Sequence, residues 1–213
     1  MVGRTFDDGE RAQLCVLMSE LGPDAPTLLS PWTTRDLAAH LAIRERRPAA
    51  APGLVLPGAW GRYAERCRVE LARTDYDTLL ETVRAGPPPG FFRLGWVRRV
   101  PNLNELFVHH EDVRRANGAL PRTSEPGLDQ ALWHNACAGA WFLTRRLRGI
   151  GLELEWSETA EVRRVRRGRP TVRVVGPPGE LLLHLFGRRD AAVVELRGPE
   201  DAVEIVEATH FGM

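Results

Sequence analysis

Three residues, His40, Glu105 and His109, have the types and spacing to bind one divalent cation. Glu105 and His109 lie four positions apart in a segment of helical character, so their side chains are stacked on one face of the helix. His40 ends a second segment of helical character, residues 32–40. Two histidines and a carboxylate that leave coordination positions open are typical of a catalytic metal site, whereas a structural zinc site is closed and richer in cysteine. Taken singly, each residue is also compatible with an ordinary packing or surface role.

The residues around the pair have alternative roles. His110 points about 100° away from the preceding histidine, and we expect a structural role rather than a donor to the ligands. Glu111 and Asp112, with the arginines that follow, are expected to form a solvated face; alternatively, Asp112 orients a ligand imidazole. His134 and His184 are expected to pack in the interior.

Helical segments alternate with breaks rich in proline and glycine. Thr33 and Asp36 resemble a capping box, and residues 49–59 are expected to form a connecting loop. Residues 91–100 are apolar and basic, and we expect a loop folded over a site, followed by a helix capped by Asn102 or Asn104. The expected helices cover residues 10–21, 34–47, 60–73, 76–85, 105–116 and 128–147, with Trp133, Ala140, Trp141 and Leu147 as core candidates in the last.

After Gly149 the apolar residues alternate, which is typical of strands. The expected strands are residues 152–156, 161–169, 171–175 and 192–196, and the expected helices are residues 178–186 and 199–207. The pattern therefore predicts an α+β protein, with a helical bundle in residues 1–148 and a small α+β domain in residues 149–213.

The composition is that of a globular protein without a charge excess. The chain has 213 residues, 43% of them hydrophobic, and a formal net charge of +1, so no overall field favours nucleic acid or membrane. All 29 basic residues are arginine, which excludes a Schiff-base lysine. The three cysteines form no CxxC, so neither a disulfide framework nor a thiolate zinc site is indicated. No apolar run reaches the roughly 18 residues of a membrane span, and no signal core is evident. We expect a cytoplasmic monomer or homodimer.

Other chemistries lack their motifs. The chain has no GxSxG, GxxxxGK[ST] or GxGxxG. The basic run at residues 163–169 could contact phosphate, but an exposed hairpin face is the favoured interpretation.

Several segments resemble a known superfamily. Residues 32–41, Trp-Thr-Thr-Arg-Asp-Leu-Ala-Ala-His-Leu, resemble the signature of the DinB-like superfamily in its mycothiol-dependent maleylpyruvate isomerase branch. Residues 105–109, Glu-Leu-Phe-Val-His, resemble the second metal-binding segment of that branch, and residues 176–188 resemble its C-terminal domain, which is related to sterol carrier proteins. Residues 21–27 and 44–48 resemble an actinobacterial subgroup known only as metal-binding.

The resemblance implies a DinB-like four-helix bundle with a divalent metal held by His40, Glu105 and His109. Zinc is the expected metal, although iron, nickel and manganese accept the same ligands. The resemblance also implies mycothiol as the thiol cosubstrate. A thiol bound to the cation would be a strong nucleophile at neutral pH, because the cation deprotonates it. The thiolate would then add to a small electrophilic substrate, in an isomerisation or a thiol transfer.

Arg35, Arg44 and Arg114 are candidates to contact an anion or the thiol cofactor. The favoured hypothesis is a metal-dependent thiol transferase or isomerase with small-molecule partners and no nucleic-acid or membrane partner. The alternative is a non-catalytic metal-binding module that senses or stores a small ligand, because no general acid or base is evident beyond the ligands. A third interpretation is a structural bundle with a vestigial site.

Overall fold

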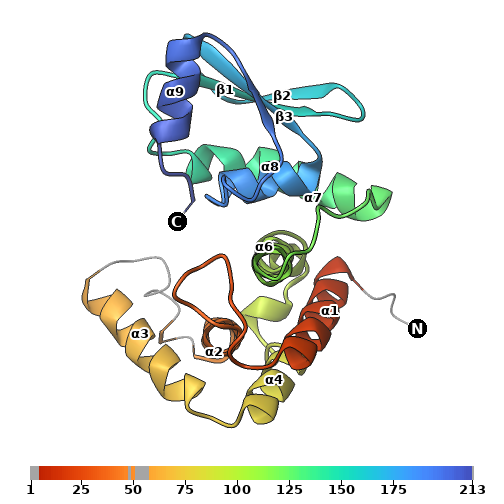
Figure 1. The fold of residues 1–213 in the computed structure, drawn as a ribbon, viewed down its shortest axis with the longest axis vertical. Coiled ribbons are helices and arrows are strands. Elements are labelled where there is room, and N and C mark those ends of the chain that lie inside the picture. The colour runs from red at the N-terminus through yellow and green to blue at the C-terminus, as the bar shows by residue number, and fades with distance from the viewer. Residues whose placement is uncertain (1–4, 48, 51–57, 213) are drawn as a thin grey trace. The chain divides into compact units, whose positions relative to one another are not determined.

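The computed structural model describes residues 5–47, 49–50 and 58–212, and the chain divides into two compact units, Met1–Leu120 and Pro121–Met213 (Figure 1). Within these residues the first unit is helical, and the second combines helices with a sheet. The α+β fold class expected from the sequence is therefore confirmed.

A shared apolar core organises the first unit. Its helices are α1 (Phe6–Leu21), α2 (Thr34–Arg46), α3 (Ala59–Ala72), α4 (Tyr76–Arg84) and α6 (Leu103–Ala116). Among the described helices, α1, α2, α4 and α6 contribute to one core, with Leu14, Leu37, Leu79 and Leu106 almost completely buried. Burying each such side chain contributes about 1.5–3 kcal/mol. These four helices form the expected bundle, and α3 packs against α2.

Local signals place the start of α2, the helix that carries the first site residue. The backbone N–H of Thr33 donates to the carboxylate of Asp36 at 3.0 Å, and this confirms the capping box. The connecting loop expected at residues 49–59 lies largely outside the described residues.

The segment before α6 is helical, which corrects the expected loop. It consists of a 3-10 turn η2 (Phe91–Arg93), a short turn α5 (Gly95–Val97) and a π-helical turn η3 (Arg98–Asn102). The chain thus enters α6 in helical conformation, so neither Asn102 nor Asn104 is needed as a cap, and Asn102 makes no cap bond. Its side chain instead donates to the carbonyl of Phe92 at 2.9 Å and accepts from Arg44 at 3.0 Å.

The second unit is built on a mixed sheet. Its helices are α7 (Pro126–Leu143), α8 (Pro178–Leu185) and α9 (Glu200–Ala208), and its strands are β1 (Gly151–Trp156), β2 (Glu161–Arg166), β3 (Thr171–Gly176) and β4 (Glu195–Arg197). Within residues 121–212 the strand order is β2-β1-β3-β4, with β1 parallel to β3 and the other two pairs antiparallel. Leu152, Leu154, Val172 and Val174 are fully buried, as the alternating pattern predicts.

The division between the units falls after residue 120, not after residue 148 as expected. The physical reason is the packing of α7, which lies against α8 and β2 and buries Leu132, Trp133, Ala136 and Ala140. Trp141, expected in the core, is 67% exposed. The helix that the sequence assigned to the bundle therefore belongs to the sheet unit.

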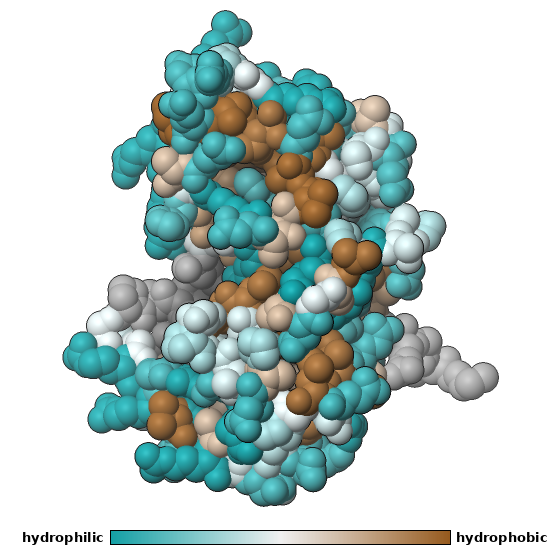
Figure 2. All heavy atoms as spheres, viewed as in Figure 1, coloured by the Kyte–Doolittle hydropathy of each residue, from teal (hydrophilic) through white to brown (hydrophobic). Residues whose placement is uncertain are grey.

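The visible surface carries both hydrophilic and hydrophobic residues (Figure 2). Figure 2 shows one face on which hydrophilic residues dominate, with the largest group of hydrophobic residues in the upper part of the view and smaller groups below it. In the part of the chain that the structure describes, no helix is long and apolar enough to cross a membrane.

Candidate metal centre

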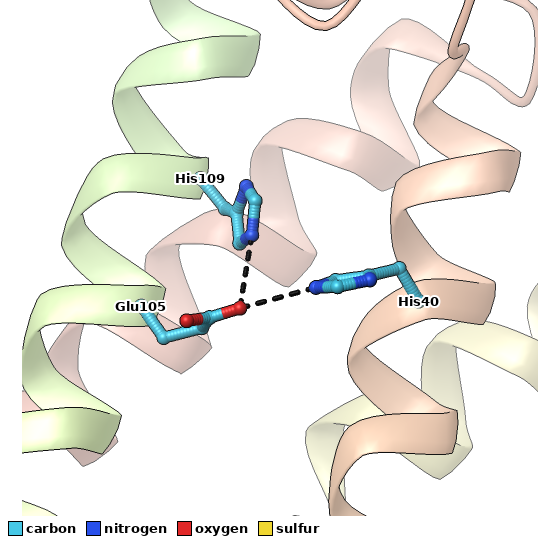
Figure 3. A group of neighbouring side chains, drawn as sticks. All are labelled: His40, Glu105 and His109. Atoms are coloured by element: carbon cyan, nitrogen blue, oxygen red, sulfur yellow. Dashed lines mark hydrogen bonds and ion pairs between the residues drawn. The ribbon is translucent and has the colours of Figure 1, made fainter. Parts of the chain in front are cut away.

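The three expected ligands meet in the first unit. His40 comes from α2, and Glu105 and His109 come from successive turns of α6. Nε2 of His40 lies 3.1 Å from Oε1 of Glu105, and Nε2 of His109 lies 3.2 Å from the same oxygen. Figure 3 shows the two imidazoles approaching this carboxylate oxygen from different sides. One ligand atom from each residue lies within 4.8 Å of the others, so a single cation can contact all three.

Asp112 fixes which nitrogen of His109 faces the cluster. Its Oδ2 lies 2.8 Å from Nδ1 of His109, and the Asp112 side chain is completely buried. A carboxylate can only accept, so Nδ1 carries the proton and a neutral His109 has its lone pair on Nε2. That lone pair faces Glu105. The lone pair on Nε2 and Oε1 of Glu105 are both acceptors, and they lie 3.2 Å apart. This short distance is favourable only if Nε2 is protonated or if both atoms bind the same cation.

The pKa shifts of the three residues indicate which of them carries a charge. Burial would lower the pKa of His109, but hydrogen bonds to Asp112 and Glu105 outweigh it and raise the pKa. Burial lowers the pKa of His40 despite its hydrogen bond to Glu105. Burial would raise the pKa of Glu105, but the charge of Arg44 and the two imidazoles hold it well below its usual range. The carboxylate is therefore ionised, and without a cation His109 is the more readily protonated histidine.

Arg44 lies beside the cluster. It is four residues after His40 on α2, and its Nε lies 3.8 Å from Oε1 of Glu105. The guanidinium also donates to the side chain of Asn102 and lies over the ring of Phe92, with its carbon 5.0 Å from the ring centroid. Of the three arginines named from the sequence, the structure brings this one to the ligands.

Arg35 and Arg114 have other partners. Arg35 donates to the carbonyls of Ala72 and Thr74 at 3.1 and 2.9 Å, where it joins α2 to the end of α3. Arg114 donates to Glu111 at 2.6 Å. The structure does not place either among the ligands, and contact with an anion stays a prediction for both.

The residues that follow His109 are buried, which corrects the expected solvated face. Glu111 and Asp112 are both fully buried because α6 packs closely against α1 and contributes Leu106 and Val113 to the shared core. His110 lies 2.9 Å from Glu10 of α1, consistent with the structural role expected for it. His134, expected to pack, is exposed, whereas His184 is buried as expected.

The chemistry of the donors fits a divalent cation. The cluster offers two imidazole nitrogens and one ionised carboxylate, with Asp112 on the far nitrogen of one imidazole, as is usual for metal-bound histidine. The side chains of His40 and Glu105 are 13% and 12% exposed, so each keeps a small part of its surface open. This arrangement suits a cation that keeps coordination positions for exogenous ligands.

Comparison with known proteins supports the fold. No protein-family model matches the chain, and no curated protein sequence matches it. Among solved structures, the chain is similar to the crystal structure of the mycothiol-dependent maleylpyruvate isomerase, with a TM-score of 0.59 and 16% identity over 89% of this chain and 88% of that chain. The chain therefore shares its fold, over nearly its whole length, with that isomerase.

Proposed function

We propose that this chain is a divalent-metal-binding enzyme that uses a small thiol, with mycothiol as the expected thiol. The enzyme would either isomerise a small electrophilic substrate or transfer the thiol to it. The observation that carries the proposal is the convergence of His40, Glu105 and His109 within 4.8 Å. The fold shared with a mycothiol-dependent isomerase supports the same conclusion by analogy.

The residues of the cluster have separate tasks in this proposal. A divalent cation, with zinc expected, would lower the pKa of a coordinated thiol and so provide a nucleophile at neutral pH. His40, Glu105 and His109 would hold the cation. Asp112 keeps the proton on Nδ1 of His109, so the lone pair on Nε2 would be free to bind the cation.

Arg44 is the arginine beside the cluster that would contact an anionic group of the thiol or the substrate. Its guanidinium is held beside Glu105 by Asn102, so its position is fixed before a ligand arrives. A fixed guanidinium can orient a carboxylate through charge-assisted hydrogen bonds.

A second candidate is a metal-binding module without catalysis, which senses or stores a small ligand. The observation that favours it is the lack of a free acid or base beside the ligands in the described part of the chain. Asp112 is hydrogen-bonded to His109, and Arg44 is hydrogen-bonded to Asn102. Proton transfer in an enzyme would then depend on the substrate, the thiol or water.

The test is calorimetric titration of the zinc-loaded protein with mycothiol and with its S-methylated form, followed by assays of thiol-dependent turnover on electrophiles. We expect the free thiol to bind more tightly than the blocked thiol. This preference should be lost in His40→Ala and kept in His134→Ala, the matched control at an exposed histidine. No affinity for mycothiol would overturn the thiol proposal. Binding without turnover of any electrophile would favour the non-catalytic module.

A further inference from the structure

A groove in the second unit takes no part in the proposed metal chemistry. It is lined by Trp141 of α7 and by Arg164, Val165, Arg166 and Arg167 at the end of β2, and its volume is about 600 Å³. All five residues belong to the unit Pro121–Met213. The volume lies within the roughly 300–1,000 Å³ of small-molecule sites.

An irregularity in β2 builds one wall of this groove. Glu153 of β1 pairs with Arg164, but the next residue back, Leu152, pairs with Arg166, so Val165 is an extra residue in β2. Without it, Arg164 and Arg166 would point to the same face of the sheet. The bulge instead puts Arg166 on the face of the sheet that carries buried Leu152, and α7 packs against β2. Arg164 and Arg166 therefore lie on opposite faces of β2, and both line the groove together with Trp141.

The groove presents charged side chains without partners among the described residues, and an exposed aromatic ring. Arg164 is paired with Glu153 at 3.0 Å. The side chains of Arg166 and Arg167 make no hydrogen bond or ion pair with any residue that the structure describes. Trp141 leaves 67% of its surface exposed. Two unpaired guanidinium groups and an open indole thus line one hollow.

These groups recognise complementary parts of a ligand. Guanidinium groups bind phosphate through paired, charge-assisted hydrogen bonds. An exposed indole stacks on a planar ring, and a nucleic-acid base is a ring of this kind. A nucleotide carries both parts in one molecule. The groove has the size for one small ligand, and a net charge of +1 gives the chain no general attraction for long nucleic acid.

We propose that this groove binds a free nucleotide, with the base against Trp141 and the phosphates on Arg166 and Arg167. The binding site is separate from the metal cluster, whose ligands all belong to the unit Met1–Leu120. Its existence is independent of the proposed thiol chemistry.

Isothermal titration of the full chain with ADP, in the presence of EDTA so that no metal centre can bind the phosphates, tests the proposal. We expect one ADP per chain. Trp141→Ala and the double substitution Arg166→Gln/Arg167→Gln should each weaken binding about tenfold or more, since base stacking and phosphate contacts are of this size. The double variant should also show a smaller dependence on salt.

Two matched controls lie outside the groove. Trp60→Ala removes another exposed tryptophan, and Arg163→Gln removes an exposed arginine of β2 that is paired with Glu161. Both should bind ADP as the wild type does, and so should His40→Ala. The proposal is overturned by no binding at millimolar ADP, by equal affinity in wild type and groove variants, or by equal affinity for inorganic phosphate and ADP. Tighter binding of a short single-stranded oligonucleotide than of ADP would also overturn it.

Discussion

The substitution Asp112→Asn tests how the proposed ligand His109 is held. Oδ2 of Asp112 lies 2.8 Å from Nδ1 of the imidazole, and the carboxylate is completely buried. Asparagine has the same size and can still accept this hydrogen bond, so the change removes the charge and little else. Carboxylate partners of this kind are worth about 10- to 100-fold in metal affinity, or about 1.4–2.7 kcal/mol. We expect the dissociation constant for zinc to rise by about this factor.

The assay is competition with a chromophoric zinc chelator at neutral pH, with circular dichroism to verify that each variant is folded. Glu111→Gln is the matched control, because Glu111 is the preceding residue on α6, is equally buried, and is bonded to Arg114 and Arg115 rather than to a ligand. It should keep the wild-type affinity. Wild-type affinity in Asp112→Asn, or an equal loss in both variants, would refute the reasoning.

Three further predictions concern pH and stability. Because its contacts with carboxylates outweigh burial and raise the pKa of His109, a proton competes with the metal there, and zinc affinity should fall as the pH falls through that raised pKa in a series of zinc titrations. Burial lowers the pKa of His184 to about 4 from 6.5, so the unfolded chain binds a proton in this window that the folded chain does not. The free energy of unfolding should therefore drop as the pH falls from 6.5 towards 4, and urea denaturation of His184→Phe should show a weaker dependence. Glu45→Gln should cost about 3–5 kcal/mol in urea denaturation, because it leaves the Arg11 guanidinium buried without its carboxylate, whereas the double substitution Arg11→Met/Glu45→Leu should recover most of that loss.

The sequence predicted the cluster of proposed metal ligands because its geometry is largely local. Glu105 and His109 share a helix face through their spacing, and that spacing holds in α6. The meeting with His40 depends on how α2 and α6 contribute to one core, and here the resemblance to a family supplied what spacing could not. Asp112 follows His109 by three residues, so a single helical turn is enough to explain its contact. The sequence alone leaves two roles open for Asp112, because the burial of this side of α6 depends on its packing against α1.

The expectations from the sequence were wrong for features that depend on tertiary packing. Residues 91–100 have no helical periodicity, yet their turns are held by contacts from distant elements, such as Arg44 over Phe92. The apolar face of α7 suits a bundle and a sheet equally well, so its partner could not be predicted. The exposure of Trp141 depends in the same way on what packs against α7. Local pattern therefore predicted the elements, while their partners required the three-dimensional structure.

The central claim is that His40, Glu105 and His109 bind one divalent metal ion. Elemental analysis of the untagged protein, with His40→Ala and His109→Ala alongside and His134→Ala as the control, tests it most directly. We predict about one metal ion per chain in the wild type and the control, and loss of the metal from both ligand variants. No metal in the wild type after reconstitution with zinc, or full metal content in both ligand variants, would contradict the account.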